Sequence, residues 1–565
     1  MAKPAPSYQK LRGGYYTPKP IADFLAHWAI QSPEAEVLEP SCGDGVLLQS
    51  AFEALVERGA EPQRAAELLH GVEIDGREGR KAISRIEALC VKPPTSLIHP
   101  GDFFAYCKAH LNDKRLFDAV IGNPPFIRYQ HFIEEQREPA FELMSKADMR
   151  PNRLTNTWVP FVVASSFLVG DEGRLAMVIP AELLQVNYAA ELRRFLSDYY
   201  NKITLITFRK LVFEGIQQEV VLLLGERNGE GRGGIRTIEL DGTNDLASYE
   251  HTDFTGSELK PMDHSTEKWT QYFLNKAEIK LLRAMRADPA LTNAGKVIDV
   301  DVGIVTGQNQ FFVLNDEQVK SRRLGDYTLP IVGRSGHLKG AIFSEADWRA
   351  NVEANLPAHL LNLPDVPQAE LPKEGDDYVA SGEEEGLNTG YKCRIRQRWY
   401  VVPSVWTPDA FMLRQVHGYP KIIVNKTKAT CTDTIHRVKL LNGTKGEVIA
   451  AAFLNSLTFA FSEVMGRSYG GGVLELEPNE AEKLPLPLNG AERLDLSQLH
   501  ELLLRDNIEA VLDLTDSVLL IDGLGLTEKE TKMLRRIWQK LRDRRINRKH
   551  GGKRSEPAGA FKGEL

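Results

Sequence analysis

The chain has 565 residues, of which 42% are apolar and 26% charged, and its net charge is −7. This length predicts two to four domains, and the composition excludes wholesale disorder. Because the net charge is negative, any affinity for nucleic acid has to come from local basic surface.

Membrane, secretory and disulfide-rich classes are also disfavoured. No run of eighteen apolar residues occurs, and no apolar stretch of the kind found in signal peptides follows the start at Met1. We therefore expect a cytoplasmic protein. The cysteines are odd in number and form no Cys-x-x-Cys pair, which argues against a zinc site or a disulfide framework. They are Cys42, Cys90, Cys107, Cys393 and Cys431.

Short apolar runs alternate with longer amphipathic stretches in the first part of the chain. The predicted strands cover residues 37–38, 70–74, 117–121 and 174–179, and the predicted helices cover residues 47–58, 77–89, 158–168 and 181–198. This alternation predicts an α/β domain, a doubly wound parallel sheet with helices on both faces. Runs at 203–208 and 219–224 predict two more strands that close one edge of the sheet.

A glycine turn follows the first predicted strand, in Val37-Leu38-Glu39-Pro40-Ser41-Cys42-Gly43-Asp44-Gly45. Glycines here allow a tight turn, so a ligand can approach the main chain at the carboxyl end of the sheet. Leu48 occupies the third-glycine position of the dinucleotide fingerprint, which disfavours that class. Glu39 suits a positively charged ligand such as a sulfonium amino acid. A purely structural turn is the alternative.

Acids also end the next two strands. Glu73 can accept hydrogen bonds from ribose hydroxyls, and Asp102 lies beside Phe103, which suits an adenine amino group with a stacking face. A single acid of this kind is more often a solvated strand end. Three at successive strand ends predict one nucleoside-type pocket.

Asn123-Pro124-Pro125-Phe126 directly follows a predicted strand and is the most informative stretch. Asn-Pro-Pro-aromatic arises by chance in roughly one chain of this length in a few hundred. Two prolines make a stiff loop with free carbonyl groups. The amide oxygen of Asn123 and the carbonyl oxygen of Pro124 can both accept from the amino group of adenine and aim its lone pair at a methyl group. Phe126 offers a stacking face, worth about 1–3 kcal/mol. A turn that merely contains Pro-Pro is the alternative.

In this order the motifs resemble the gamma class of adenine-N6 DNA methyltransferases, over about residues 12 to 225. Gly14-Tyr15-Tyr16-Thr17-Pro18 resembles that family's upstream methionine-binding motif. The resemblance implies a Rossmann-like class I methyltransferase sheet and S-adenosylmethionine as the cofactor. It places Thr17, Glu39, Gly43 and Asp44 near the methionine part, Glu73 at the ribose, and Asp102 with Phe103 at the adenine, and we count Ser41 and Ile74 among the cofactor-binding residues as well.

The resemblance also implies that Asn123, Pro124, Pro125 and Phe126 are the catalytic residues. Phe213 lies where family members often carry a second aromatic residue that clamps the extruded base. Phe213 could equally belong to the core.

The second half carries weaker signals. The glycine-rich residues 226–234 predict a domain boundary or an exposed loop, and the acidic residues 351–390 predict an insertion or surface loop. Residues 302–313 and 467–476 resemble the TaqI-like C-terminal specificity domain. We expect a catalytic domain at 1–235, a mixed α+β DNA-recognition domain at 236–490, and a helical segment with a basic tail at 491–565.

An enzyme that modifies a base must extrude it and hold the remaining duplex. Residues 391–400 and 421–428 mix cations, amides and aromatic rings that can contact phosphates and base edges, although solvated edge strands would look the same. Residues 532–554 hold eleven Lys or Arg against one Asp, which fits a surface helix or a DNA arm.

The sequence thus predicts a site-specific methyltransferase acting on adenine N6 in double-stranded DNA, by base flipping and direct transfer. No metal, membrane or obligate protein partner is expected, and the oligomeric state stays open. RNA or protein-glutamine methylation is an alternative, although such enzymes are usually shorter; cytosine-N4 methylation more often has Ser in place of Asn123. A combined restriction–modification enzyme usually carries a nuclease domain before the upstream motif, and only eleven residues precede Arg12. A non-catalytic DNA-binding subunit is disfavoured by the intact Asn123–Phe126 loop.

Overall fold

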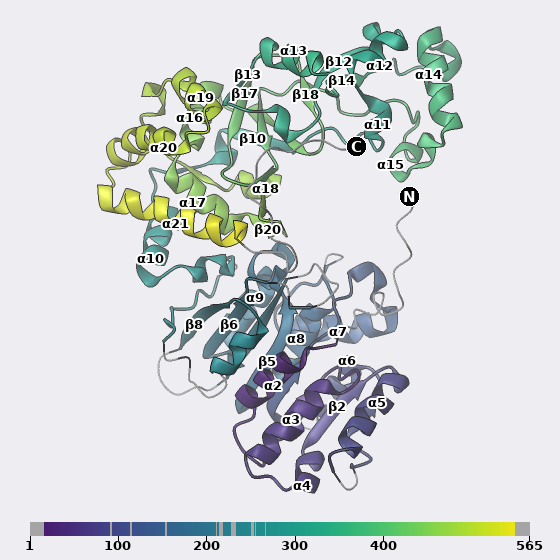
Figure 1. The fold of residues 1–565 in the computed structure, drawn as a ribbon, viewed down its shortest axis with the longest axis vertical. Coiled ribbons are helices and arrows are strands. Elements are labelled where there is room, and N and C mark those ends of the chain that lie inside the picture. The colour runs from purple at the N-terminus through teal and green to yellow at the C-terminus, as the bar shows by residue number, and fades with distance from the viewer. Residues whose placement is uncertain are drawn as a thin grey trace. The chain divides into compact units, whose positions relative to one another are not determined.

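The structure is a computed structural model that describes residues 16–90, 93–112, 116–152, 155–210, 212–213, 219–227, 233–249, 254, 256–265, 267–469 and 471–547. By its internal contacts the chain divides into two compact units, one up to Lys276 and one over Ala277–Ile546 (Figure 1). Each unit is described by itself, as unit 1 and unit 2.

Unit 1 is built on one eight-stranded sheet with the order β3-β2-β1-β4-β5-β7-β6-β8. Strands β1 to β5 pair in parallel, β7 runs antiparallel to both β5 and β6, and β8 is parallel to β6. The strands are β1 (Val37–Glu39), β2 (Leu69–Glu73), β3 (Ile98–Pro100), β4 (Phe117–Gly122), β5 (Val169–Pro180), β6 (Lys202–Phe208), β7 (Val220–Glu226) and β8 (Gly234–Leu240).

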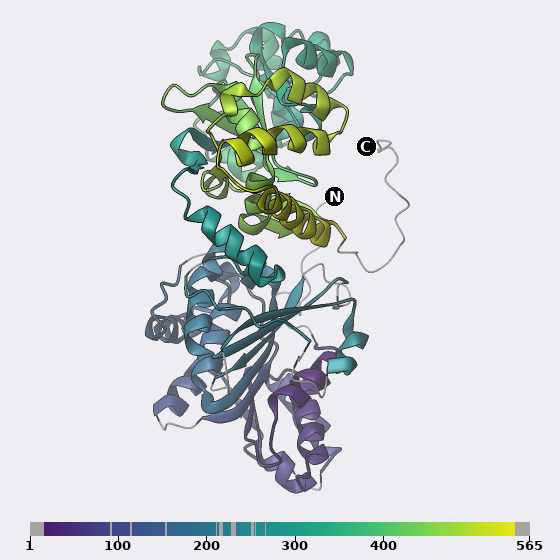
Figure 2. The same cartoon turned by 90° about the vertical axis from the view of Figure 1, so that its left-hand side faces the viewer.

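Both faces of this sheet are covered by helices. They are α2 (Lys19–Ala29), α3 (Val46–Glu57), α4 (Pro62–Glu67), α5 (Gly76–Glu87), α6 (Phe103–Asn112), α7 (Glu134–Lys146), α8 (Trp158–Phe167) and α9 (Ala190–Tyr199). Ala119 and Ile121 of β4 join the apolar core under α2 and α3, while α6, α8 and α9 lie on the other side (Figure 1, Figure 2). Since successive side chains of a strand face opposite sides, both faces need apolar residues. The predicted α/β fold is confirmed.

One local prediction in unit 1 needs revision. The expected helix over residues 181–198 is interrupted: short 3-10 helices (Ala181–Leu184, Asn187–Ala189) precede α9. The buried guanidinium of Arg193 donates to the carbonyl oxygens of Leu183 (2.9 Å) and Val186 (3.0 Å), so these acceptors are satisfied without a continuous helix.

The glycine-rich stretch after β7 leads into β8, which pairs along its whole length with β6. Residues 228–232 of that stretch lie outside the described residues; because β8 belongs to the same sheet as β7, the sheet extends past residue 235.

Unit 2 is a mixed α+β structure with several small sheets. The five-stranded sheet contains β10 (Ile298–Val302), β19 (Ile435–Leu440), β15 (Ala410–Leu413), β17 (Ile422–Asn425) and β13 (Ile342–Phe343). The four-stranded sheet contains β11 (Val313–Leu314), β14 (His359–Leu361), β12 (Thr328–Val332) and β18 (Thr430–Cys431). The remaining strands are β16 (Gln415–Val416), β20 (Arg467–Tyr469) and β21 (Val473–Glu475) in one sheet, and β9 (Thr292–Asn293) and β22 (Pro485–Leu486) in another.

The helices from residue 276 onward are α10 (Lys276–Arg286), α11 (Asn309–Phe312), α12 (Asp316–Ser321), α13 (Glu345–Glu353), α14 (Lys373–Glu384), α15 (Tyr391–Arg394), α16 (Gly446–Phe453), α17 (Ser456–Met465), α18 (Pro478–Ala481), α19 (Leu496–Leu504), α20 (Ile508–Asp516) and α21 (Glu528–Ile546). Among the described residues, no single helix is long and apolar enough to span a membrane. The bent pair of α16 and α17 would be so only if the two helices are counted together, by length and composition alone.

The prediction of a surface loop over the acidic residues 351–390 is wrong. This stretch contains β14 and α14, and its few apolar residues, among them Leu360, Leu371 and Val379, belong to a core cluster of unit 2. Sparse apolar residues are sufficient here because several of them occupy core positions, while most of the acids are exposed.

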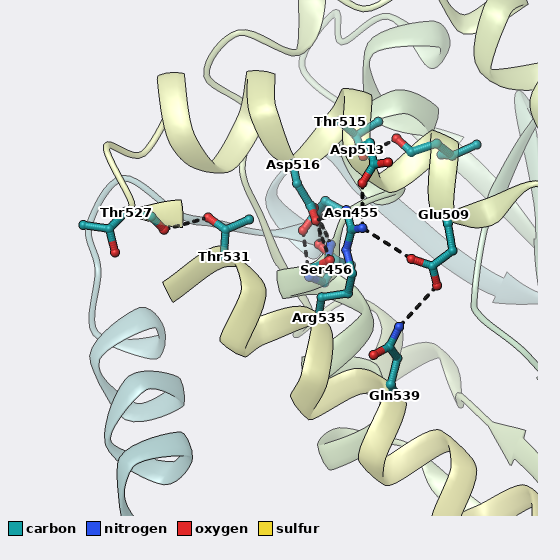
Figure 3. A network of polar contacts seen from close by, with 12 residues as sticks. Asn455, Ser456, Glu509, Asp513, Thr515, Asp516, Thr527, Thr531, Arg535 and Gln539 are labelled. Atoms are coloured by element: carbon teal, nitrogen blue, oxygen red, sulfur yellow. Dashed lines mark hydrogen bonds and ion pairs between the residues drawn. The ribbon is translucent and has the colours of Figure 1, made fainter. Parts of the chain in front are cut away.

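Buried polar contacts join α20 and α21 to α17 (Figure 3). The carboxylate of Asp516 accepts hydrogen bonds from the backbone nitrogen of Ser456 (2.8 Å), its hydroxyl (2.5 Å) and the Arg535 guanidinium (3.0 Å). Trp538 of α21 is fully buried. The basic segment predicted at 532–554 is thus a helix with one packed face up to Ile546, and residues 548–554 lie outside the described residues.

Candidate active site

A cavity of about 300 Å³ opens in unit 1 where the loops after β1, β2, β3 and β4 meet. The carboxyl ends of parallel strands share one edge of a sheet, so residues distant in sequence converge there. Ten of the predicted site residues line it: Thr17, Glu39, Ser41, Gly43, Asp44, Glu73, Ile74, Phe103, Asn123 and Pro125. Asp102, Pro124, Phe126 and Phe213 are not among its lining residues.

The glycine turn after β1 forms one wall. Gly45 begins α3 with φ of +83°, and a Cβ atom there would lie 2.7 Å from the Cα atom of Ala82, so only glycine fits. Arg85 of α5 secures the turn, because its guanidinium donates to the carbonyl oxygen of Asp44 (3.0 Å) and to its carboxylate (2.7 Å). The backbone is thereby held close to the cavity.

Glu39 is the most unusual charged group of the cavity. It is only 2% exposed, and its Oε2 atom has no hydrogen-bond partner among the described residues. Burial, together with the nearby carboxylates of Asp44 and Glu73, raises the pKa of Glu39 well above its usual value. A buried carboxylate oxygen without a hydrogen-bond partner is costly unless a cation approaches it. The cavity wall is therefore suited to a positively charged ligand.

Glu73 is held from two sides at the end of β2. Its Oε2 atom accepts from the backbone nitrogen of Gly43 (2.9 Å), and its Oε1 atom accepts from that of Asp75 (2.7 Å). Burial raises its pKa. Each carboxylate oxygen can accept a further hydrogen bond. A carboxylate whose orientation is already fixed can therefore bind the two hydroxyl groups of a diol.

The far end of the cavity is aromatic. Phe103 and Phe161 stack with ring centroids 5.2 Å apart, and Ile74, which is 56% exposed, lies at the opening. Asp102 flanks this end: it caps α6 through the nitrogen of Ala105 (2.9 Å) and accepts from the Gln136 amide (2.6 Å). Burial raises the pKa of Asp102. Gln136 of α7 and Phe161 of α8 line the cavity and have no motif that could have predicted them.

The Asn123–Phe126 loop leaves the end of β4. The Asn123 amide donates to the hydroxyl oxygen of Thr17 (3.2 Å), and the Ser41 hydroxyl donates to the Asn123 carbonyl oxygen (3.4 Å). Because the side-chain nitrogen of Asn123 points toward Thr17, the side-chain oxygen points away from Thr17. Pro124 is buried and Phe126 packs against the core of unit 1.

Thr157, just before α8, makes further hydrogen bonds to this loop. Its hydroxyl donates to the Pro125 carbonyl oxygen (2.5 Å) and accepts from the backbone nitrogen of Ile127 (3.0 Å). Its own backbone nitrogen donates to the Ile127 carbonyl oxygen (3.0 Å). Thr157 is 2% exposed and lines the cavity. Sequence reasoning missed it, because Thr157 lies 32 residues from Pro125 and belongs to no motif.

Phe213 is 8% exposed and lies in the same apolar cluster against which Phe126 packs. Its assignment as a base clamp stays a prediction. Among the described residues, no group of three or more His, Cys, Asp or Glu side chains could hold a metal ion.

Of the two stretches of unit 2 predicted to contact DNA, one lies inside a sheet and the other is exposed. β17, within residues 421–428, lies inside its sheet between β15 and β13, so it is not an edge strand. Lys421 is buried and its ammonium donates to the carbonyl oxygens of Leu338 and Lys339; burial lowers its pKa to about 8. Lys426 pairs with Glu447. By contrast, α15 (Tyr391–Arg394) is a short helix with several exposed side chains.

Comparisons with known proteins match both halves of the chain. Residues 1–285 match a family model described as N-6 DNA Methylase, and residues 266–520 match the C-terminal domain of the type II methyltransferase M.Eco57I. The type II methyltransferase M.AccI of Acinetobacter calcoaceticus is 22% identical over 501 residues, which cover 84% of this chain and 85% of that protein. M.HindII of Haemophilus influenzae is 26% identical over 349 residues, 59% of this chain and 60% of that protein. Among solved structures, the type IIG restriction endonuclease BpuSI aligns with a TM-score of 0.41 at 14% identity, covering 95% of this chain and 66% of that chain.

Proposed function

The chain belongs to the N-6 DNA methylase family, whose model matches more than half of it, and we propose from this premise how its residues methylate adenine. The predicted family resemblance and the assignment as an adenine-N6 DNA methyltransferase are confirmed. RNA or glutamine methylation and a fused nuclease are not favoured, because the curated relatives are named type II methyltransferases. The substrate we propose is adenine in double-stranded DNA of the cytoplasm.

The proposed methyl donor is S-adenosylmethionine, and the observation that supports it best is the unpartnered Glu39 oxygen in a cavity that Asn123 also lines. When bound, this cofactor supplies an electrophilic methyl group on a sulfonium centre. Glu39 faces its positively charged methionine part, where the carboxylate gains the cation it lacks. The Glu73 carboxylate binds the ribose hydroxyls, and Phe103, Phe161 and Asp102 receive the adenine.

The target amino group is held by Asn123 and Pro124. Adenine N6 is a poor nucleophile because its lone pair is delocalised into the ring. The side-chain oxygen of Asn123 and the carbonyl oxygen of Pro124 accept its two hydrogens and direct the lone pair toward the methyl group. The bond from the Asn123 amide nitrogen to Thr17 sets the orientation of the amide, so that its oxygen, which is the acceptor, lies on the other branch. The proton becomes acidic once the methyl group arrives, so no general base is required.

Thr157 acts as a positioning residue in this scheme. Its hydrogen bonds to Pro125 and Ile127 restrain the loop, as the bond to Thr17 restrains Asn123. Restraint at these points holds the acceptor oxygens in place before the base arrives, which lowers the reorganisation needed at the moment of transfer.

The function is tested by expressing the full chain in a bacterial host that lacks adenine methylation and sequencing its DNA with detection of modified bases. We expect N6-methyladenine within one sequence context. Asn123→Ala should abolish the modification while the purified variant still binds S-adenosylmethionine. Absence of N6-methyladenine with the wild type, or full modification with Asn123→Ala, would refute the proposed roles.

A further inference from the structure

Helix α15 of unit 2 and the residue that follows it present an exposed apolar pair. Tyr391 is 65% exposed and Ile395 is 59% exposed, the two highest values among the large apolar side chains of the described residues. The backbone nitrogen of Ile395 bonds to the carbonyl oxygen of Tyr391 (3.2 Å), so both side chains lie on one side of a single helical turn. Isolated exposed apolar residues are ordinary, but a paired patch on a rigid element indicates a contact surface.

Cations on the same turn divide into two groups. Arg396 points inward: its guanidinium donates to the carbonyl oxygens of Val305 (2.9 Å) and Thr306 (2.7 Å). Lys392 and Arg394 are exposed, and within the described part of the chain neither takes part in an ion pair or hydrogen bond through its side chain. One cation therefore fixes the turn, while the two others remain available to a partner.

The turn is also held tightly against the neighbouring loop. Gly307 has φ of +83°, and a Cβ atom there would lie 2.7 Å from the Cβ atom of Lys392 and 3.3 Å from the Cys393 sulfur. Only glycine allows this approach. The loop continues into Asn309 and Gln310, which are exposed. Two cations without ion pairs, two apolar side chains and two amides are thus presented by a rigid platform; the Asn309 oxygen already accepts from the Thr306 hydroxyl, so its amide nitrogen is the group offered to a partner.

We propose that this platform, formed by Tyr391, Lys392, Arg394 and Ile395 with the amides of Asn309 and Gln310, contacts duplex DNA. The identity of the nucleic acid rests on the proposed function. Lys392 and Arg394 bind phosphates, because unpaired cations on a chain with a net charge of −7 provide the local positive surface that DNA requires. Tyr391 and Ile395 pack against sugars or base edges, and the amides match hydrogen-bonding groups of the bases.

The test is the salt dependence of binding to a duplex oligonucleotide, measured by fluorescence anisotropy on the full chain with S-adenosylmethionine present. In Lys392→Gln/Arg394→Gln, the slope of log K against log salt should become shallower by about 1.8, since each lost phosphate contact removes about 0.9. Tyr391→Ala should weaken binding about tenfold with the slope unchanged, because a lost stacking or packing contact releases no counterions.

Leu504→Ala/Arg505→Gln is the matched control. Leu504 is 46% exposed and the Arg505 side chain is 75% exposed, so they form another exposed apolar–cation pair on unit 2, one whose cation lies 4.0 Å from the Glu501 carboxylate. This variant should bind DNA like the wild type, and all variants should bind S-adenosylmethionine unchanged. If the wild type methylates DNA and the platform variants keep its affinity and slope, the platform is refuted while the function stands. If the wild type neither methylates nor binds duplex DNA, the proposed function itself fails.

Discussion

Replacing Thr157 by valine removes one hydroxyl group from a buried position at nearly constant volume. The Pro125 carbonyl oxygen and the Ile127 nitrogen then lose their partner, while the bond from the Thr157 nitrogen to the Ile127 carbonyl oxygen remains. A buried polar group without a partner costs about 1–3 kcal/mol, so the free energy of unfolding should fall by about that amount unless the loop moves. Either response loosens the Asn123–Phe126 loop.

The effect on turnover should exceed the effect on cofactor binding. A displacement of about 1 Å at a reacting group can lower the rate about 10²-fold, so we expect kcat to fall about 10- to 100-fold. Because valine preserves the cavity wall, the dissociation constant for S-adenosylmethionine should change by less than about threefold. Single-turnover methylation of a duplex substrate and calorimetric titration of the cofactor measure the two quantities separately.

Two variants control this experiment. Thr157→Ser keeps the hydroxyl group and should restore most of the turnover. Thr155→Val removes another buried hydroxyl from the same segment, one that accepts from the Asn152 nitrogen (3.1 Å), and should leave kcat near the wild-type value. Wild-type kcat in Thr157→Val, or an equal loss in Thr155→Val, would show that the contacts of Thr157 with the loop do not position it.

Glu39→Gln should weaken S-adenosylmethionine binding at least tenfold, as measured by calorimetry. Because burial raises the pKa of Glu39, its ionisation destabilises the folded state. The variant should therefore melt at the same temperature as the wild type or at a higher one. The affinity of the wild type for the cofactor should decline as pH falls through this raised pKa, because only the ionised carboxylate attracts the cation. Glu39→Gln should lose that pH dependence. A wild-type affinity that does not change with pH would exclude this role of Glu39. In unit 2, Asp516→Ala should lower the free energy of unfolding in urea by about 3–5 kcal/mol, since it leaves the Arg535 guanidinium and the Ser456 groups without their buried partner. Asp513→Ala removes a 71% exposed partner of the same arginine and should cost less than about 1 kcal/mol; equal losses in the two variants would contradict the importance of burial.

The parallel sheet and the loops that carry Glu39, Glu73 and Asn123 could be predicted from the sequence alone. Each loop directly follows a strand with a clear apolar run, and the carboxyl ends of parallel strands necessarily meet at one edge of the sheet. Local pattern therefore determines that these side chains converge. The Asn123–Phe126 loop is predictable for a second reason, since two consecutive prolines restrict the backbone whatever surrounds them.

Thr157, Gln136 and Phe161 reach the same cavity from elements at or near the starts of helices α7 and α8, and their roles depend on how those helices pack. No residue pattern reports such a distance in space. The same holds for the acidic residues 351–390 and for the interrupted helix at 181–198, where buried leucines and the guanidinium of Arg193 replace the contacts that local propensity assumes. The strand ends, which the sequence determines, are sufficient to bring the acids and the Asn123 loop together. Which groups hold them in place is decided by the tertiary structure, because hydrogen bonds and buried surface between distant segments form only in the folded chain.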